Sequence, residues 1–142
     1  MATGGGTADK CLKIWDTTQN QLLVNVDTSS QICNILWSKN SLEICSTHGY
    51  SQNMIHVWKY NDASNASPSD TSAAMRDFGW FEQSSSSLKQ LFAFQAHNSR
   101  VLYAALGPDL ETICTAAADM HLKCWKIFQH QRVLNTTTRL MR

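Results

Sequence analysis

The stretch Ala118–Lys126 reads ADMHLKCWK, and it is the last of three stretches of one shape that decide the fold of this chain. The other two are Ala8–Asp16 (ADKCLKIWD) and Gln52–Lys59 (QNMIHVWK). Each has an apolar residue three positions before a tryptophan and a second one directly before it. Because alternate side chains of a strand point to opposite faces of a sheet, this spacing predicts a β-strand that ends near each tryptophan.

The tryptophans of the first two stretches, Trp15 and Trp58, are 43 residues apart. A repeat of about 40–45 residues that closes on a Trp-Asp-like pair is typical of one blade of a WD-repeat propeller. Trp58 and Trp125 are 67 residues apart, so additional sequence lies between the second and third stretches. The pattern therefore predicts an all-β chain that forms part of a WD-repeat β-propeller.

The repeat divides the chain into four parts. Residues 1–60 are expected to hold a partial blade (3–16) and one full repeat (20–59), residues 61–87 an insertion, residues 88–128 the last blade, and residues 129–142 a tail. The strands expected in the two repeats are Gln21–Val26, Ile32–Trp37, Leu42–Thr47, Met54–Trp58, Leu91–Phe94, Val101–Leu106, Thr112–Ala116 and Leu122–Ile127.

The insertion at 61–87 is rich in Ser, Ala, Asn and Asp, a composition that buries too little apolar surface to order itself. It also carries a small apolar group: Met75, Phe78, Trp80 and Phe81. One interpretation is a flexible loop that lays these side chains on its own propeller. The other is an insert that binds a partner or is regulated by phosphorylation, and both stay open.

The predicted blades are too few to close a ring. A propeller typically has four to eight blades, and this chain supplies about two and a half. Blades pack face to face, so a partial ring leaves apolar faces in water, and Leu12 and Ile14 are expected to have no preceding strands to pack on. We therefore expect the chain to be the C-terminal piece of a longer protein or an incomplete gene model.

Composition and charge narrow the classes of partner. The chain has 142 residues, of which 43% are hydrophobic and 16% charged, and its net charge is +1. So small a net charge gives no electrostatic footprint for nucleic acid or an anionic membrane, and we expect neither as a partner. No run of about 18 apolar residues predicts a membrane helix, and the first residues, MATGGG, do not resemble a signal peptide.

The cysteines are odd in number, are scattered, and never form a C-x-x-C motif. This pattern favours small buried hydrophobic side chains in a reducing compartment over disulfides or zinc ligands. The five residues are Cys11, Cys33, Cys45, Cys114 and Cys124.

A polar set in the last repeat predicts a structural role. His97 is followed 22 residues later by Asp119 and then by Trp125, and Thr115 occupies a predicted strand between them. In a WD blade such a loop His, turn Asp, strand hydroxyl and strand Trp bind one another, and a paired buried chain of this kind rigidifies the blade. The alternative, a general base at His97, lacks an accompanying nucleophile or carboxylate constellation.

The other residues that could carry chemistry do not support catalysis. Gly4-Gly5-Gly6 precedes a predicted strand rather than a helix, so it is interpreted as a turn and not as a phosphate loop. We expect no metal, no cofactor and no enzymatic activity. The remaining histidines, which show no metal-ligand spacing, are His48, His56, His121 and His130.

Four further runs carry a resemblance to a known family: Ala2–Asp9 (ATGGGTAD), Ser30–Ser38 (SQICNILWS), His48–Asn53 (HGYSQN) and Ser99–Leu102 (SRVL). Through these runs the chain resembles the fizzy/fizzy-related family over nearly all of its length except the insertion and part of the tail. The resemblance implies a WD-propeller activator and substrate receptor of the anaphase-promoting complex, a ubiquitin ligase, in the nucleus and cytoplasm. It also implies a ring of seven blades, of which this chain would be the last part.

The resemblance also implies a binding site. Carried over by position, the family's pocket for the Lys-Glu-Asn degron would include Thr7, Gln31 and Arg100. The residue types suit this role, because Arg100 offers a planar set of donors and Gln31 offers both a donor and an acceptor. All three are predicted at strand starts or turns, where loops of neighbouring blades converge. The alternative is that Gln31 and Arg100 only cap loop backbone.

One position departs from the family. After the turn residue Asp119 the family has an acidic residue that helps to hold the arginine of the destruction-box degron, whereas this chain has Met120. A neutral thioether does not pair with a guanidinium group, so destruction-box binding is expected to be lost or altered. Asp119 does not replace the missing charge if the blade's own hydrogen bonds occupy it.

The tail at 129–142 carries Arg132 and Arg139, no acidic residue, and the ending Met141-Arg142. The family ends in Ile-Arg, which docks on a helical-repeat subunit of the ligase. Met141 and Arg142 are therefore expected to dock there, with a loss of about 1 kcal/mol for Met in place of Ile. The alternative is an unstructured basic tail without a partner.

Other functions remain as alternatives to this reading. They are a WD-repeat scaffold of another subfamily that binds unrelated peptides, a truncated product without activity of its own, and an enzyme whose catalytic domain lies upstream. The resemblance does not distinguish a mitotic from a meiotic activator.

Overall fold

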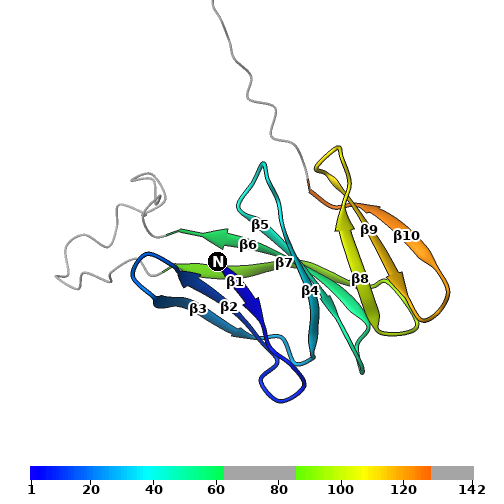
Figure 1. Cartoon of the computed structure of the whole chain (residues 1–142), viewed down its shortest axis with the longest axis horizontal. Helices are drawn as coiled ribbons and strands as arrows, with labels where there is room; N and C mark the ends of the chain where they lie inside the picture. Colours follow the sequence, from blue (N-terminus) through cyan, green and yellow to red (C-terminus); the bar gives the residue numbers. More distant parts are fainter. Residues whose placement is uncertain (63–85, 129–142) are drawn as a thin grey trace, which may run out of the picture.

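The computed structural model describes residues 1–62 and 86–128, and this part of the chain contains ten β-strands and no helix (Figure 1). No described segment is therefore a helix that could span a membrane. The fold is all-β, as the sequence predicts. The strands are β1 (Ala2–Gly4), β2 (Cys11–Asp16), β3 (Gln21–Asp27), β4 (Ile32–Trp37), β5 (Glu43–His48), β6 (Met54–Asn61), β7 (Ser87–Gln95), β8 (Val101–Leu106), β9 (Thr112–Ala117) and β10 (Leu122–Lys126).

Two groups of predicted residues lie outside the described residues. They are the apolar group Met75, Phe78, Trp80 and Phe81 of the insertion, and the tail with Met141 and Arg142.

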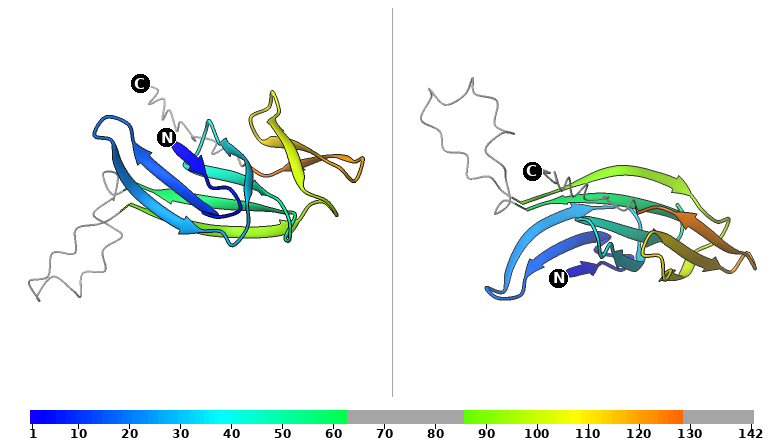
Figure 2. Two further views of the ribbon diagram at one scale, coloured as in Figure 1. Left: turned by 60° about the horizontal axis from the view of Figure 1, so that its bottom comes forward. Right: turned by 90° about the horizontal axis from the view of Figure 1, so that it is seen from above.

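The strands form three antiparallel sheets with the orders β1-β2-β3, β4-β5-β6-β7 and β10-β9-β8. The sheets stand side by side, and β4 of the middle sheet contacts β1 on one side and β8 on the other (Figures 1 and 2). A propeller blade has four strands, so the ten strands correspond to two and a half blades. The fold is therefore a partial β-propeller.

The sheets are offset by one strand from the repeats expected from the sequence. β3 opens the expected repeat at residue 20 but pairs with β2 of the first sheet, for example through Ile14 and Val24. β7 opens the expected repeat at residue 88 but pairs with β6 of the middle sheet, for example through Val57 and Phe92. The reason is that the strand after each closing tryptophan turns back and joins the same sheet. The insertion thus connects two neighbouring strands of one sheet.

The first apolar interface lies between the first and middle sheets. Leu12 and Ile14 of β2 are 0% and 2% exposed, and they pack in one cluster with Ile44 and Trp58 of the middle sheet. The sequence analysis expects no preceding strands for Leu12 and Ile14 to pack on; the sheet that buries them follows them in the sequence. Each such buried side chain contributes about 1.5–3 kcal/mol, so this interface fixes the two sheets together.

The second apolar interface lies between the middle and third sheets. Val57 of β6 and Ile113 of β9 are buried there, together with Phe128, which follows β10. Alternate residues of β6 point to opposite sides, so Val57 packs in this interface whereas Trp58 packs in the first. The middle sheet is therefore covered on both faces.

In residues 1–62 and 86–128, no segment covers the outward face of the third sheet. Tyr103 and Leu122 are each 72% exposed there. Cys114 and Cys124 stand opposite each other on the same face, in the register of β9 and β10. The interpretation of the cysteines as buried side chains is correct for Cys45 but wrong for Cys124, which is exposed because no described residue packs on this face.

Candidate functional site

Four side chains bind one another at the centre of the third sheet. The indole N–H of Trp125 donates to the Thr115 hydroxyl at 2.9 Å, and His97 Nε2 lies 2.9 Å from the same oxygen. On the other side of its ring, His97 Nδ1 lies 3.0 Å from a carboxylate oxygen of Asp119. His97 and Thr115 are each 1% exposed, so these bonds satisfy polar atoms that water does not reach. The structure brings together the four residues that the sequence analysis groups into one set.

Asp119 is occupied by donors of its own turn and of the β7–β8 loop. It accepts backbone hydrogen bonds from Asn98 at 3.2 Å and His121 at 3.1 Å, in addition to its contact with His97. Burial works to raise the pKa of Asp119, but these donors outweigh it and lower the pKa to about 2. Met120, next in the turn, is 96% exposed with a φ of 59°. The turn therefore presents a neutral side chain to solvent.

The middle sheet has a different hydrogen-bonded set, which the sequence analysis missed. Trp58 donates its indole N–H to Ser46 Oγ at 2.8 Å, and the same oxygen lies 2.8 Å from His48 Nε2. His48 Nδ1 in turn lies 2.7 Å from the Ser30 hydroxyl. The available signal was the spacing of Ser46 and His48, which are two residues apart and so share one face of β5.

His56 lies against His48, with ring centroids 4.1 Å apart. His56 is 6% exposed, and neither of its ring nitrogens has a hydrogen-bond partner in the described structure. Burial lowers the pKa of both histidines, and the neighbouring His56 lowers that of His48 further, to about 3. The pair is therefore neutral at neutral pH and acts as packing within the sheet.

Five loops lie on one side of the molecule, toward the lower right of Figure 1. They join β1 to β2, β3 to β4, β5 to β6, β7 to β8 and β9 to β10; we call this side the loop side. The three residues implied by the resemblance lie on it: Thr7 between β1 and β2, Gln31 directly before β4, and Arg100 directly before β8. Strand alternation explains this placement, because every second connection of an antiparallel sheet falls at the same end.

Gly49 stands between Gln31 and Arg100. Its N–H donates to the Gln31 carbonyl at 2.9 Å, and a Cβ at this position would lie 3.2 Å from Arg100 Nε. The missing side chain lets Arg100 cross close to the backbone of the β5–β6 loop. The sequence analysis did not identify this role of Gly49, since the contact joins loops of two different sheets.

The loop side therefore presents polar groups from three loops. Thr7 and Arg100 are exposed, and Gln31 is partly buried. Together they offer a hydroxyl, a side-chain amide and a guanidinium, which suit a ligand with carboxylate and amide groups. Among the described residues of this side, no nucleophile lies beside a positioned base.

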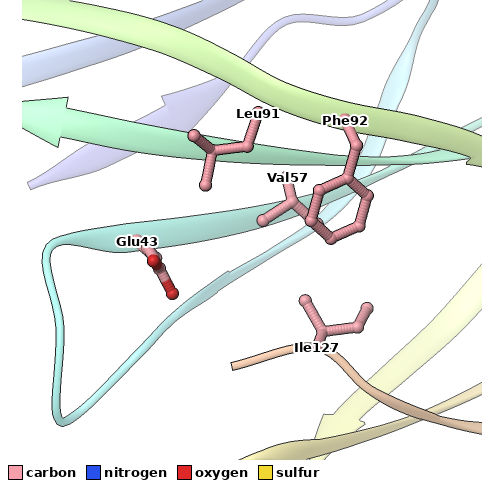
Figure 3. Close-up of a pocket in the computed structure, with 5 residues that line it drawn as sticks. All are labelled: Glu43, Val57, Leu91, Phe92 and Ile127. Carbon is pink, nitrogen blue, oxygen red and sulfur yellow. The ribbon is translucent and has the colours of Figure 1, made fainter. Parts of the chain in front are cut away.

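A pocket of about 230 Å³ lies elsewhere, beside strand β7 (Figure 3). Its walls are Val57, Leu91, Phe92 and Ile127, with Glu43 beside them. A small-molecule site needs several convergent polar groups, and this pocket has a single carboxylate, so it gives no candidate catalytic centre. In residues 1–62 and 86–128, no group of three or more His, Cys, Asp or Glu residues could hold a metal ion.

Comparison with known proteins gives several matches. A family model described as WD domain, G-beta repeat matches residues 88–126. Protein FIZZY-RELATED 2 of Arabidopsis thaliana is 39% identical over 140 residues, which is 99% of this chain and 24% of that protein. Anaphase-promoting complex subunit cdh1 of Dictyostelium discoideum is 40% identical over 128 residues, which is 90% of this chain and 14% of that protein.

A solved structure matches in the same way. A chain in the crystal structure of the Mitotic Checkpoint Complex superposes with a TM-score of 0.71 and 34% sequence identity. The match covers 90% of this chain and 33% of that chain. This chain thus spans a third or less of these three proteins, while 90% or more of its own residues take part in the matches to them.

Proposed function

This chain is homologous to the fizzy-related proteins over most of its length, and on that premise we propose that it forms the substrate-receptor part of an anaphase-promoting-complex activator. The observation that supports this most is the meeting of Gln31 and Arg100 around Gly49 on the loop side. In this role the protein does no chemistry. It raises the effective concentration of a degron-bearing substrate near the ligase, in the nucleus and cytoplasm.

The proposed ligand of the loop side is the Lys-Glu-Asn degron. Arg100 can donate two parallel hydrogen bonds to the glutamate carboxylate, the strongest geometry for such a pair. Gln31 can pair with the asparagine amide, since each amide offers a donor and an acceptor. Thr7 adds a hydroxyl that can donate or accept.

Destruction-box binding is proposed to be weak in this protein. Its recognition would need a free carboxylate near the β9–β10 turn, and Asp119 already accepts hydrogen bonds from the Asn98 and His121 amides and contacts His97. Met120 supplies no charge for an arginine.

The tail is proposed to hold the protein on the ligase. Met141 and Arg142 would dock on a helical-repeat subunit through an apolar plug, a guanidinium and the terminal carboxylate. A Met in this position keeps an apolar side chain of similar volume to Ile, and such exchanges usually cost less than about 1.5 kcal/mol.

Peptide binding to the full chain tests the degron site. A labelled peptide with Lys-Glu-Asn, and a matched peptide with three alanines, are titrated with the chain and followed by fluorescence anisotropy. Arg100→Ala should weaken binding of the first peptide by about tenfold or more, because hydrogen bonds to a charged group contribute about 1.5–3 kcal/mol. Lys89→Ala, which removes an exposed cation of the outer strand β7, is the control and should bind like the wild type. Equal binding of the two peptides, or of Arg100→Ala and the wild type, contradicts the site.

The tail is tested separately. A synthetic peptide of residues 129–142 should bind the helical-repeat subunit of the ligase, and amidation of its terminal carboxylate should weaken that binding. Absence of binding by both forms would contradict docking and would favour a WD-repeat scaffold of another subfamily.

A further inference from the structure

The third sheet holds two thiols side by side on its outward face. Cys114 of β9 and Cys124 of β10 are direct cross-strand partners, and their sulfur atoms lie 2.7 Å apart. Cys124 is exposed and Cys114 is partly exposed. No other strand register in residues 1–62 and 86–128 sets two cysteines opposite each other.

The geometry of the pair suits a covalent bond. Directly opposed residues of an antiparallel pair have Cα atoms about 4.5–5.5 Å apart, and disulfides span Cα separations of about 4.4–6.8 Å. The two sulfurs are already in contact, so bond formation needs no shift of the strands. We propose that Cys114 and Cys124 form a reversible dithiol–disulfide pair, oxidised by a low-molecular-weight disulfide such as oxidised glutathione.

The exchange proceeds in two steps that balance. The Cys124 thiolate attacks one sulfur of oxidised glutathione, a mixed disulfide forms, and one glutathione thiolate leaves and takes up a proton. The Cys114 thiolate then attacks the Cys124 sulfur, and the second glutathione leaves in the same way. The two protein sulfurs are oxidised, and the two glutathione sulfurs are reduced. The hydrogen bond with Cys124 raises the pKa of Cys114, which is also the less exposed thiol, so Cys124 makes the first attack.

The other thiols are poorly placed for this reaction. Cys45 is fully buried, and burial raises its pKa to about 12, so it is rarely a thiolate. Burial also raises the pKa of Cys33 and of Cys11. Neither has a cysteine opposite it in its strand register.

The disulfide would link β9 to β10, the two strands of the hairpin that carries the β9–β10 turn. Thr115 and Trp125, the neighbours of the two cysteines in the sequence, point to the other face and belong to the buried hydrogen-bonded set. The oxidised hairpin would thus be linked on both faces, and the turn with Asp119 and Met120 would lose mobility. This inference stands independently of the degron site.

Peptide mapping tests the pair on the full chain. Trypsin cleaves after Lys and Arg, and this places the five cysteines on five different peptides: residues 11–13, 14–39, 40–59, 101–123 and 124–126. The reduced chain is equilibrated with mixtures of reduced and oxidised glutathione, free thiols are alkylated, and the digest is read by mass spectrometry. We expect peptide 101–123 joined to peptide 124–126 to exceed any other pairing by about tenfold, because these two sulfurs are in contact before oxidation and so have the highest effective concentration for each other. Dithiothreitol should reverse the bond.

Two controls make the test specific. Phenylarsine oxide binds paired thiols, and the wild-type chain should bind one equivalent of it. This binding should be lost in Cys114→Ser and in Cys124→Ser. Cys11→Ser, which removes an unpaired and partly exposed thiol, should keep both the linked peptide and the arsenical binding. The proposal is overturned if the wild-type chain gives only mixed disulfides with glutathione, or if another cysteine pairing dominates.

Discussion

In each described sheet a tryptophan donates its indole N–H to a hydroxyl on the neighbouring strand: Trp15 to Thr3, Trp58 to Ser46 and Trp125 to Thr115. At the scale of single residues, this hydroxyl is the group whose loss should cost the most stability. In the middle and third sheets it also contacts a buried histidine, so its removal leaves two polar partners unsatisfied.

Thr115→Val tests this role in the third sheet. Valine keeps the branched shape of threonine, but it removes the acceptor of the Trp125 N–H and the contact with His97. We expect the free energy of unfolding to fall by about 1–3 kcal/mol, measured by urea unfolding with tryptophan fluorescence. Thr17→Val, in an exposed turn, is the matched control and should change stability little. An equal loss in both variants would refute the role of the buried hydroxyl.

His48 should make the stability depend on pH. Its pKa is about 3 in the folded protein, because it is buried beside His56, and the ordinary value is 6.5. Unfolding therefore takes up a proton below pH 6.5, so the stability is full above 6.5 and falls as the pH drops from there toward 3. Urea unfolding should show a loss of about 1–2 kcal/mol on going from about pH 7.5 to about pH 5.

Two histidine variants show which residue causes this pH dependence of stability. His48→Gln should reduce the slope between these pH values, because one of the two buried histidines no longer takes up a proton, and His56 should account for part of the slope that remains. His121→Gln, which replaces a histidine side chain that is 66% exposed, is the comparison variant. An unaltered slope in His48→Gln would show that other groups cause it.

The spacing of residues in the sequence predicted only part of these hydrogen-bonded sets and loop contacts. His97, Asp119 and Trp125 stand at the separations typical of one blade, so the set of the third sheet could be expected from the sequence. The set of the middle sheet could not, because its histidine comes from the strand as His48 rather than from a loop. The role of Gly49 could not be predicted either, since its contact with Arg100 joins loops of two sheets and leaves no periodic pattern in the sequence.

At the scale of strands, the alternation of apolar residues predicts where strands form but not which sheet they join. β3 and β7 read as the first strands of new repeats, yet backbone pairing adds each of them to the preceding sheet. Loop length does not decide this assignment, because β7 pairs with β6 across the insertion although β8 is nearer to it in the sequence.

The short strand β1 gives a sharp test of how closely the first two sheets pack. A Cβ at Gly4 would lie 2.6 Å from Ile32 Cγ2 and 2.8 Å from Ile32 Cβ, whereas a Cβ at Gly6 would meet no atom within 4 Å. Gly4→Ala should therefore lower the free energy of unfolding by about 1–3 kcal/mol, the usual cost of overpacking. Gly6→Ala is the matched control and should have little effect. Urea unfolding that gives the same midpoint for Gly4→Ala and the wild type would show that the sheets are less closely packed than described.

At the scale of the whole molecule, the middle sheet is the one that the described residues cover on both faces. The third sheet presents Tyr103 and Leu122 outward, at 72% exposure each. Apolar sheet faces of this kind drive association, because burying them removes apolar area from water. The number of repeats in the sequence predicts that an apolar sheet face is exposed, whereas the strand registers are needed to identify the exposed residues.

Leu122→Glu tests whether this face makes the chain self-associate. A charge on this face should oppose its burial, and sedimentation velocity at rising protein concentration should show less oligomer than for the wild type. The side chain is exposed, so the free energy of unfolding should change by no more than about 0.5 kcal/mol. Leu42→Glu introduces the same charge at a residue that is 44% exposed between β4 and β5, away from this face, and it should associate like the wild type. A wild-type chain that stays monomeric at every concentration, or an equal effect of the two variants, would mean that the outward face of the third sheet does not drive association.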